Sequence, residues 1–134
     1  MKLLVAVDGS VQALNAVRGL IACAVQWRSA PEVHVLHVLE AGSAPAPRAA
    51  ARTADADDAG VTKASEWLEA ARLPLQVHEM TGAAAETIAR TAGDFGCGMI
   101  WMGAGGADGA PQRSIGSTAS RVLQLSDLPV VLVQ

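Results

Sequence analysis

The sequence predicts an α/β fold: a doubly wound, five-stranded parallel sheet with helices on both faces. Short apolar runs alternate with amphipathic helical patterns along the whole chain, which begins and ends with a predicted strand. The first run, Leu3–Val7, is apolar on both faces, as is typical of a strand in a covered parallel sheet. Such alternation requires right-handed crossovers that place helices on both faces. We find no repeat, linker or change of composition, so residues 1–134 are predicted to form one domain.

The remaining elements follow from the same periodicities. Ser10 is a good N-cap, and a helical apolar repeat continues from it to about Arg28. Further strands are predicted over residues 33–39, 75–80, 99–102 and 128–133, and further helices over residues 58–72, 83–95 and 119–125. Because residues 75–80 alternate between apolar and polar, we expect that strand near an edge of the sheet.

One segment, Glu40–Asp58, interrupts this regular order. It is rich in Ala, Pro, Ser and Gly, it contains Pro45 and Pro47, and it shows no clear apolar period. We therefore predict a surface loop, partly helical around Arg48–Arg52. Two roles remain open for it, a solvated connector and a flap over a binding site.

Composition excludes several classes of function. The net charge is −3 and no basic cluster is present, which argues against a nucleic-acid partner. No apolar run reaches the roughly 18 residues of a membrane span, and the first residues turn polar too soon for a signal peptide, so we expect a cytoplasmic protein. Cys23 and Cys97 lack metal-ligand spacing, and His34 and His37 point to opposite faces of one strand, so no metal site is predicted.

A glycine-rich segment follows the predicted fourth strand. Gly103, Gly105, Gly106 and Gly109 precede Gly116-Ser117-Thr118, where a helical pattern begins. Glycine allows close backbone approach and positive φ, and the N–H groups at a helix start face an anion, so we predict a phosphate site. The P-loop does not fit because no Gly-Lys pair occurs, and the dinucleotide fingerprint does not fit because Asp108 replaces its last glycine.

The first predicted strand ends in Asp8-Gly9-Ser10. Ligands of doubly wound sheets bind outside the carboxyl ends of the strands, where the strand order reverses. If the first and fourth strands are neighbours there, Asp8 faces the glycine-rich segment. Its carboxylate would repel phosphates, so we place it at the other end of the ligand, accepting hydrogen bonds from a ribose hydroxyl or an adenine amine. A turn or capping role is the alternative for Asp8.

Several motifs together resemble the universal stress protein family. Gly103-x2-Gly106-x9-Gly116-Ser117 resembles the family's ATP-binding signature. Val5–Ser10 resembles its opening motif, His37-Val38 the end of its second strand, and Leu128–Val133 its closing strand, so the resemblance covers nearly the whole chain. It implies the strand order 3-2-1-4-5 of the adenine nucleotide alpha hydrolase-like fold and a nucleotide-dependent regulatory function in the stress response.

The resemblance also implies which residues bind a ligand, namely ATP, AMP or another adenine nucleotide. Asp8 and Val38 would contact the nucleoside, and Gly103, Gly106, Gly116 and Ser117 the phosphates. Their neighbours in the same motifs complete the candidate set: Val7, Gly9, Ser10, Met102, Ala104 and Thr118. Whether magnesium accompanies the nucleotide is left open.

No catalytic residue is predicted. Ser117 has no base nearby in the sequence to activate it, so we interpret it as part of a helix N-terminus. A slow ATPase is one alternative, for which only Asp8, Asp108 and Arg113 are candidates. A dimeric scaffold of the same fold that binds no nucleotide is the other.

The last predicted strand has consequences for assembly. Residues 130–133 are apolar, and an unguarded edge strand of this kind invites pairing. The resemblance implies a homodimer through antiparallel pairing of this fifth strand.

Overall fold

The computed structural model describes residues 1–40, 47–105 and 114–134, with the backbone alone described for residues 47–57. Strands and helices alternate as predicted. In chain order the elements are β1 (Lys2–Ala6), α1 (Val11–Ala24), β2 (Glu32–Leu39), α2 (Pro47–Ala70), β3 (Leu75–Thr81), α3 (Ala84–Asp94), β4 (Met99–Gly103), α4 (Ser117–Leu125) and β5 (Val130–Val133).

The strands form one parallel sheet in the order β3-β2-β1-β4-β5, which confirms the predicted order. In the centre of the sheet Val5 is aligned with Val35 on one side and with Trp101 on the other. The strand order therefore reverses between β1 and β4, and the connections that follow these two strands leave the sheet side by side. This is the position at which ligands bind to doubly wound sheets.

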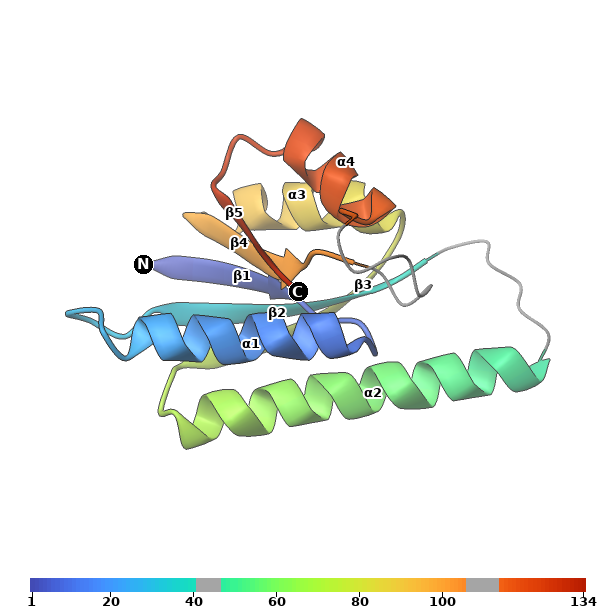
Figure 1. Ribbon diagram of the computed structural model, residues 1–134, viewed down its shortest axis with the longest axis horizontal. Coiled ribbons are helices and arrows are strands. Elements are labelled where there is room, and N and C mark those ends of the chain that lie inside the picture. The colour runs from blue at the N-terminus through green and yellow to red at the C-terminus, as the bar shows by residue number, and fades with distance from the viewer. Residues whose placement is uncertain (41–46, 106–113) are drawn as a thin grey trace.

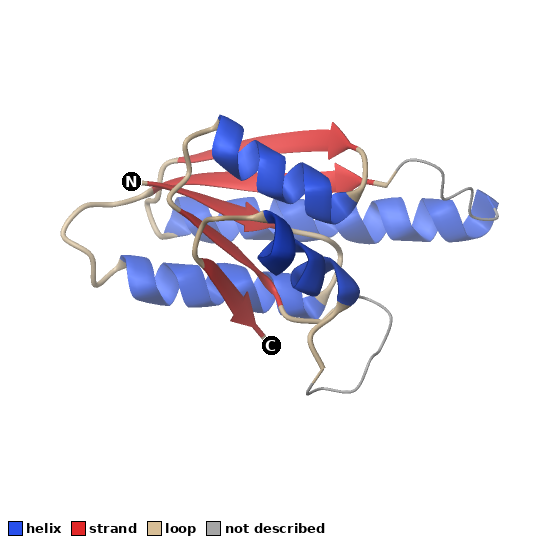
Figure 2. Cartoon of the chain, turned by 90° about the horizontal axis from the view of Figure 1, so that it is seen from above, coloured by secondary structure: helices blue, strands red, loops and turns tan. Residues whose placement is uncertain are grey.

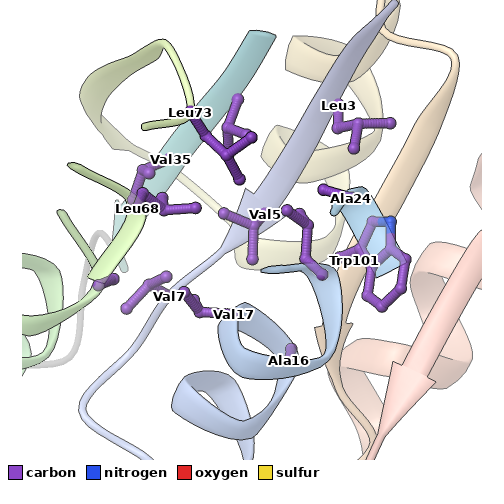
Figure 3. Packing of buried hydrophobic residues seen from close by; sticks show 13 residues of the cluster. Leu3, Val5, Val7, Ala16, Val17, Ala24, Val35, Leu68, Leu73 and Trp101 are labelled. Carbon is purple, nitrogen blue, oxygen red and sulfur yellow. The ribbon is translucent and has the colours of Figure 1, made fainter. Parts of the chain in front are cut away.

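Helices cover both faces of the sheet, as predicted (Figures 1 and 2). On one face, α1 and α2 pack over a core in which Val17, Leu68 and Val5 are fully buried (Figure 3). On the other face, α3 and α4 cover Leu4, Ile100 and further apolar residues. Burying an aliphatic side chain of this size stabilises the fold by about 1.5–3 kcal/mol. These two cores therefore fix the strands whose carboxyl ends carry the candidate site.

The prediction of a surface loop over residues 40–58, partly helical around Arg48–Arg52, is right about that helical part but makes the helix too short. Helix α2 already begins at Pro47, while residues 41–46 lie outside the described part of the chain. Proline suits the first position of a helix, and the alanine-rich sequence that follows favours helix. The first part of α2 reaches past the carboxyl ends of the strands (Figures 1 and 2), where a helix needs no core-facing apolar stripe. The prediction depended on that stripe and therefore did not extend the helix beyond Arg48–Arg52.

Helix α1 begins as predicted but ends earlier. The side chain of Ser10 accepts a hydrogen bond from Ala13 N, which confirms its role as N-cap. The helix ends at Ala24 rather than near Arg28, and the chain continues in a tighter turn in which Gln26 N donates to Cys23 O at 3.0 Å.

Candidate functional site

The turn between β1 and α1 (residues 7–10, the β1–α1 turn) is held by its neighbours in the sheet. Val7 N donates to Leu36 O at 2.9 Å, and Val7 O lies 3.1 Å from Nδ1 of the buried His37. Since a carbonyl oxygen only accepts, His37 Nδ1 carries a hydrogen and donates it. The end of β1 is thus fixed from β2, and Asp8 is the first residue to leave the sheet.

Asp8 is oriented by Ser10. Ser10 N donates to Asp8 Oδ1 at 2.9 Å, Ser10 Oγ makes a second hydrogen bond to the same oxygen, and Ala13 N donates to Ser10 Oγ at 3.2 Å. The alternative role of Asp8 as a turn residue is therefore confirmed. The residue is also exposed, so its carboxylate can accept further hydrogen bonds from a ligand.

Gly103 ends β4 and lies directly on the first turn of α1. A Cβ at this position would be 2.8 Å from Gln12 Cβ and 3.0 Å from Ala13 N, closer than side chains tolerate. The expected close backbone approach is confirmed here. The expected positive φ is wrong for Gly103, Gly105 and Gly116, because among the described glycines it occurs at Gly82 and Gly96.

The two ends of the glycine-rich segment meet. Gly116 N donates to Ala104 O at 2.6 Å, and Ala104 N donates to Val133 O at 2.8 Å. Gly116 is the N-cap of α4 and makes no side-chain capping bond, so the N–H groups of the first turn are not capped by this residue. Together with the positive end of the helix dipole, they suit a phosphate group.

An open cleft of about 500 Å³ lies beside the start of α4. It lies between the end of β2, the start of α3 and the start of α4, and Glu40, Gly82–Glu86, Ser117, Thr118 and Arg121 line it. Arg121 Nε donates to Glu86 Oε1 at 3.2 Å. A hydrogen bond from the backbone of Glu86 and the one from Arg121 hold the pKa of the Glu86 carboxyl below its usual value. The negative charge of Glu86 thus partly balances the cation in the cleft.

The predicted residues fall into two adjacent groups. Residues 7–10 form the β1–α1 turn. The other group consists of the two ends of the glycine-rich segment, Gly103–Ala104 and Gly116–Thr118. Gly103 contacts the first turn of α1, which directly follows the β1–α1 turn. Val38 is half-buried and packs with Met102 in the core beneath α3 and α4, so the side chain of Met102 is not exposed to a ligand. Gly106, Asp108 and Arg113 lie outside the described residues.

Sequence reasoning missed two residues at this edge. Gln12 receives the end of β4, and Gly60 of α2 lies against the β1–α1 turn, where a Cβ would be 3.0 Å from Asp8 O. Such contacts depend on tertiary distances and leave no periodic signal. The one signal in the sequence was Gly60 itself, because a glycine inside a helical pattern often indicates close packing against another element.

A separate polar cluster lies between β2, β3 and α3. His34 Nδ1 is 2.9 Å from His78 Nε2, and the Phe95 ring contacts both imidazoles, with centroid distances of 5.1 and 4.5 Å. Glu32 Oε1 lies 3.0 Å from His34 Nε2 without the alignment of a hydrogen bond. Burial and the neighbouring His34 lower the pKa of His78.

No group of three or more His, Cys, Asp or Glu side chains in residues 1–40, 47–105 and 114–134 is arranged to hold a metal ion. No helix in these ranges combines the length and the apolar character needed to cross a bilayer.

The sheet order and the two helical layers define a doubly wound α/β protein of the adenine nucleotide alpha hydrolase-like class. Residues 1–134 match the universal stress protein family, and the chain belongs to that family. No curated protein matches the sequence.

Solved structures resemble the whole chain. Hypothetical protein MJ0577 is 24% identical with a TM-score of 0.84, covering 98% of this chain and 94% of its own. A universal stress protein in complex with cAMP is 19% identical with a TM-score of 0.69, covering 100% and 97%. A universal stress protein family protein from Arabidopsis thaliana with AMP bound is 13% identical with a TM-score of 0.71, covering 99% and 90%.

Proposed function

We propose that this chain binds an adenine nucleotide, ATP in the first place, at the carboxyl edge of β1 and β4. Asp8 and Val38 contact the nucleoside, and the backbone around Gly103 and at Gly116–Thr118 holds the phosphates. The protein then acts as a nucleotide-dependent regulatory module of the cytoplasmic stress response. The observation that carries this proposal is the contact of Gly103 with Gln12 and Ala13 of α1, which follow the Asp8 turn, together with the hydrogen bond from Gly116 N to the next residue, Ala104.

Charge and hydrogen-bonding chemistry support this orientation of the ligand. The start of α4, where Gly116 has no side chain to cap the helix, offers N–H donors to an anion, while the exposed Asp8 carboxylate offers acceptors to hydroxyl or amine groups. A nucleotide carries both kinds of group at its two ends. The solved universal stress proteins with cAMP and AMP support an adenine nucleotide as the ligand class.

Calorimetry with ATP, AMP and cAMP tests the proposal. Gly116→Val places a branched side chain where the phosphates meet the helix start, and we expect it to abolish ATP binding. Gly98→Val is the matched control, because Gly98 precedes β4 at its opposite end, where a Cβ would meet its nearest atom at 3.9 Å. Unchanged ATP affinity of Gly116→Val would contradict the phosphate site. Repeating the ATP titration with and without magnesium determines whether the metal takes part.

Asp8→Ala tests the nucleoside end. Removing the acceptor of hydrogen bonds from the ribose or the adenine should lower the affinity for AMP about tenfold or more, since a hydrogen bond to a charged group is worth about 1.5–3 kcal/mol. Unchanged affinity for AMP would leave Asp8 with its turn role alone.

The proposal assigns no catalytic residue. In it, Ser117 is the first residue of α4, and its hydroxyl takes no part in covalent chemistry. Incubation of the purified protein with ATP and measurement of released phosphate tests this. Sustained turnover that Asp8→Ala abolishes would favour the ATPase alternative.

We also propose a homodimer through β5. This strand is an edge of the sheet, and the carbonyl groups of Pro129 and Val133 accept hydrogen bonds from Ile100 N in β4 and from Ala104 N directly after it. Because backbone groups alternate in direction along a strand, those of Leu132 face away from β4. Leu132→Pro removes an outward donor and should convert a dimer into a monomer in light scattering, with unchanged circular dichroism. A wild-type monomer at micromolar concentration would contradict this interface.

A further inference from the structure

Helix α2 touches the β1–α1 turn through a glycine. Gly60 is buried, and a Cβ built on it would lie 3.0 Å from Asp8 O, 3.6 Å from Gly9 Cα and 3.7 Å from Val7 Cγ1. The first of these distances is tighter than nine in ten real Cβ contacts, so the neighbouring atoms would have to move by a few tenths of an ångström. The helix backbone therefore rests on the peptide of Asp8 at a distance that no other residue type allows without displacement.

Comparison with another helical glycine shows that this contact is particular to Gly60. Gly93 lies in α3, is exposed, and a Cβ there would meet no atom within 4 Å. Both glycines are unfavourable inside a helix, because glycine loses more backbone freedom than alanine. Only Gly60 has a packing reason for its small size, and that reason is the turn that carries Asp8.

The remaining contacts of the turn show what Gly60 adds. His37 holds the Val7 carbonyl from β2, and Ser10 holds the Asp8 side chain from the start of α1. Between these two points the Asp8 carbonyl faces α2 at Gly60. The contact with α2 therefore supports the peptide from which the Asp8 carboxylate projects.

We propose that Gly60 is a positioning residue for the nucleoside end of the ligand site. By letting α2 seat against the Asp8–Gly9 backbone, it sets the direction in which the Asp8 carboxylate meets the ribose or the adenine. This inference rests on the proposed function, since it needs Asp8 to contact the nucleoside. It adds a residue on α2, outside every motif of the sequence analysis.

Gly60→Ala and Gly93→Ala form a matched pair for the test. Each substitution makes a helix more favourable, but only the first displaces Asp8. We expect Gly60→Ala to lower the affinity for AMP about tenfold, which is the effect of losing one hydrogen bond to a charged group. We expect Gly93→Ala to bind AMP with the affinity of the wild type. Calorimetry with AMP measures both variants, and circular dichroism verifies their folds. Wild-type affinity of a folded Gly60→Ala would overturn the inference.

A double-mutant cycle separates positioning from a general structural effect. If Gly60 acts through Asp8, then Gly60→Ala has no further effect on AMP affinity in the Asp8→Ala background. Equal losses in both backgrounds would overturn the positioning role. If the wild type binds no adenine nucleotide, the proposed function itself fails. If the wild type binds and Asp8→Ala weakens AMP while Gly60→Ala does not, only the Gly60 inference fails.

A measurement on the wild type keeps the inference testable should Gly60→Ala not fold. Addition of AMP should slow amide hydrogen exchange in residues 8–10 and also in α2 around Gly60, because ordering the turn orders the helix that rests on it. Slower exchange in the turn alone, with α2 unchanged, would overturn the inference.

Discussion

The two connections that meet at the carboxyl edge of the sheet are held in different ways. In the β1–α1 turn, Val7 bonds to β2, Asp8 bonds to Ser10, and the backbone rests on Gly60 of α2. The connection from β4 to α4 is fixed at its ends, where Gly116 N donates to Ala104 O. The proposed nucleoside end is therefore positioned by packing before a ligand arrives, whereas the proposed phosphate end presents backbone donors at a helix start.

This difference shows that two glycines of the same motif are under different physical constraints. Gly103 has no room for a Cβ because β4 lies on α1, so its small size is required whether or not a ligand binds. Gly116 has an ordinary extended φ of −63°, so the conformation alone does not require glycine there. A substitution at Gly103 therefore disturbs the packing of β4 on α1, whereas the backbone conformation at Gly116 also suits other residues.

The largest expected effect on stability is that of Gly103→Ala. The new Cβ would lie 2.8 Å from Gln12 Cβ, and overpacking of this kind costs about 1–3 kcal/mol. At Gly105 the nearest atom to a new Cβ is Gln12 Nε2 at 3.9 Å, so Gly105→Ala should stay within about 0.5 kcal/mol of the wild type. Urea unfolding measures both variants. Equal stabilities would contradict the close packing of β4 on α1.

A smaller effect is expected from Ser10→Ala, which loosens the other connection. It removes the N-cap of α1, worth about 1 kcal/mol, and one of the two bonds that hold Asp8 Oδ1. Ser10→Thr keeps the hydroxyl and is the matched control. Thermal unfolding and AMP titration should both show a loss for alanine and little change for threonine. If Ser10→Ala lost stability but kept its AMP affinity, Ser10 would cap α1 without positioning Asp8 for the ligand.

Periodic patterns in the sequence predicted the alternation of strands and helices, and the resemblance to the family supplied the strand order that the sheet shows. The exception was the first part of α2, which extends past the carboxyl ends of the strands and was predicted to be helical only around Arg48–Arg52. Length and apolar period were correct guides only where an element packs on the sheet. Pro47 followed by an alanine-rich stretch was the signal that favoured a helix instead.

The candidate site could be located from the sequence but not built from it. The strand ends and the motif spacing placed Asp8, Gly103 and Gly116 at one edge. The residues that support this edge, Gly60 and His37, act through tertiary contacts that no spacing encodes. The motif that contains His37 predicts the end of a strand, but its hydrogen bond to Val7 O depends on the pairing of β1 with β2.

The smallest expected effect is a pH dependence that involves neither connection. Burial and His34 lower the pKa of His78 below 6.5, so the unfolded chain binds this proton more readily than the folded one. Stability is therefore full above pH 6.5 and decreases as the pH falls through the window between the two pKa values. Thermal unfolding from pH 7.5 to 5 should show a shallower decrease for His78→Gln than for the wild type. Because His78 packs with His34 and Phe95 rather than at the carboxyl edge, AMP affinity at pH 7.5 should be the same in both proteins. A changed AMP affinity would mean that the cluster of His34, His78 and Phe95 also positions the ligand site. The support of the site would then extend from the two connections to β2 and β3.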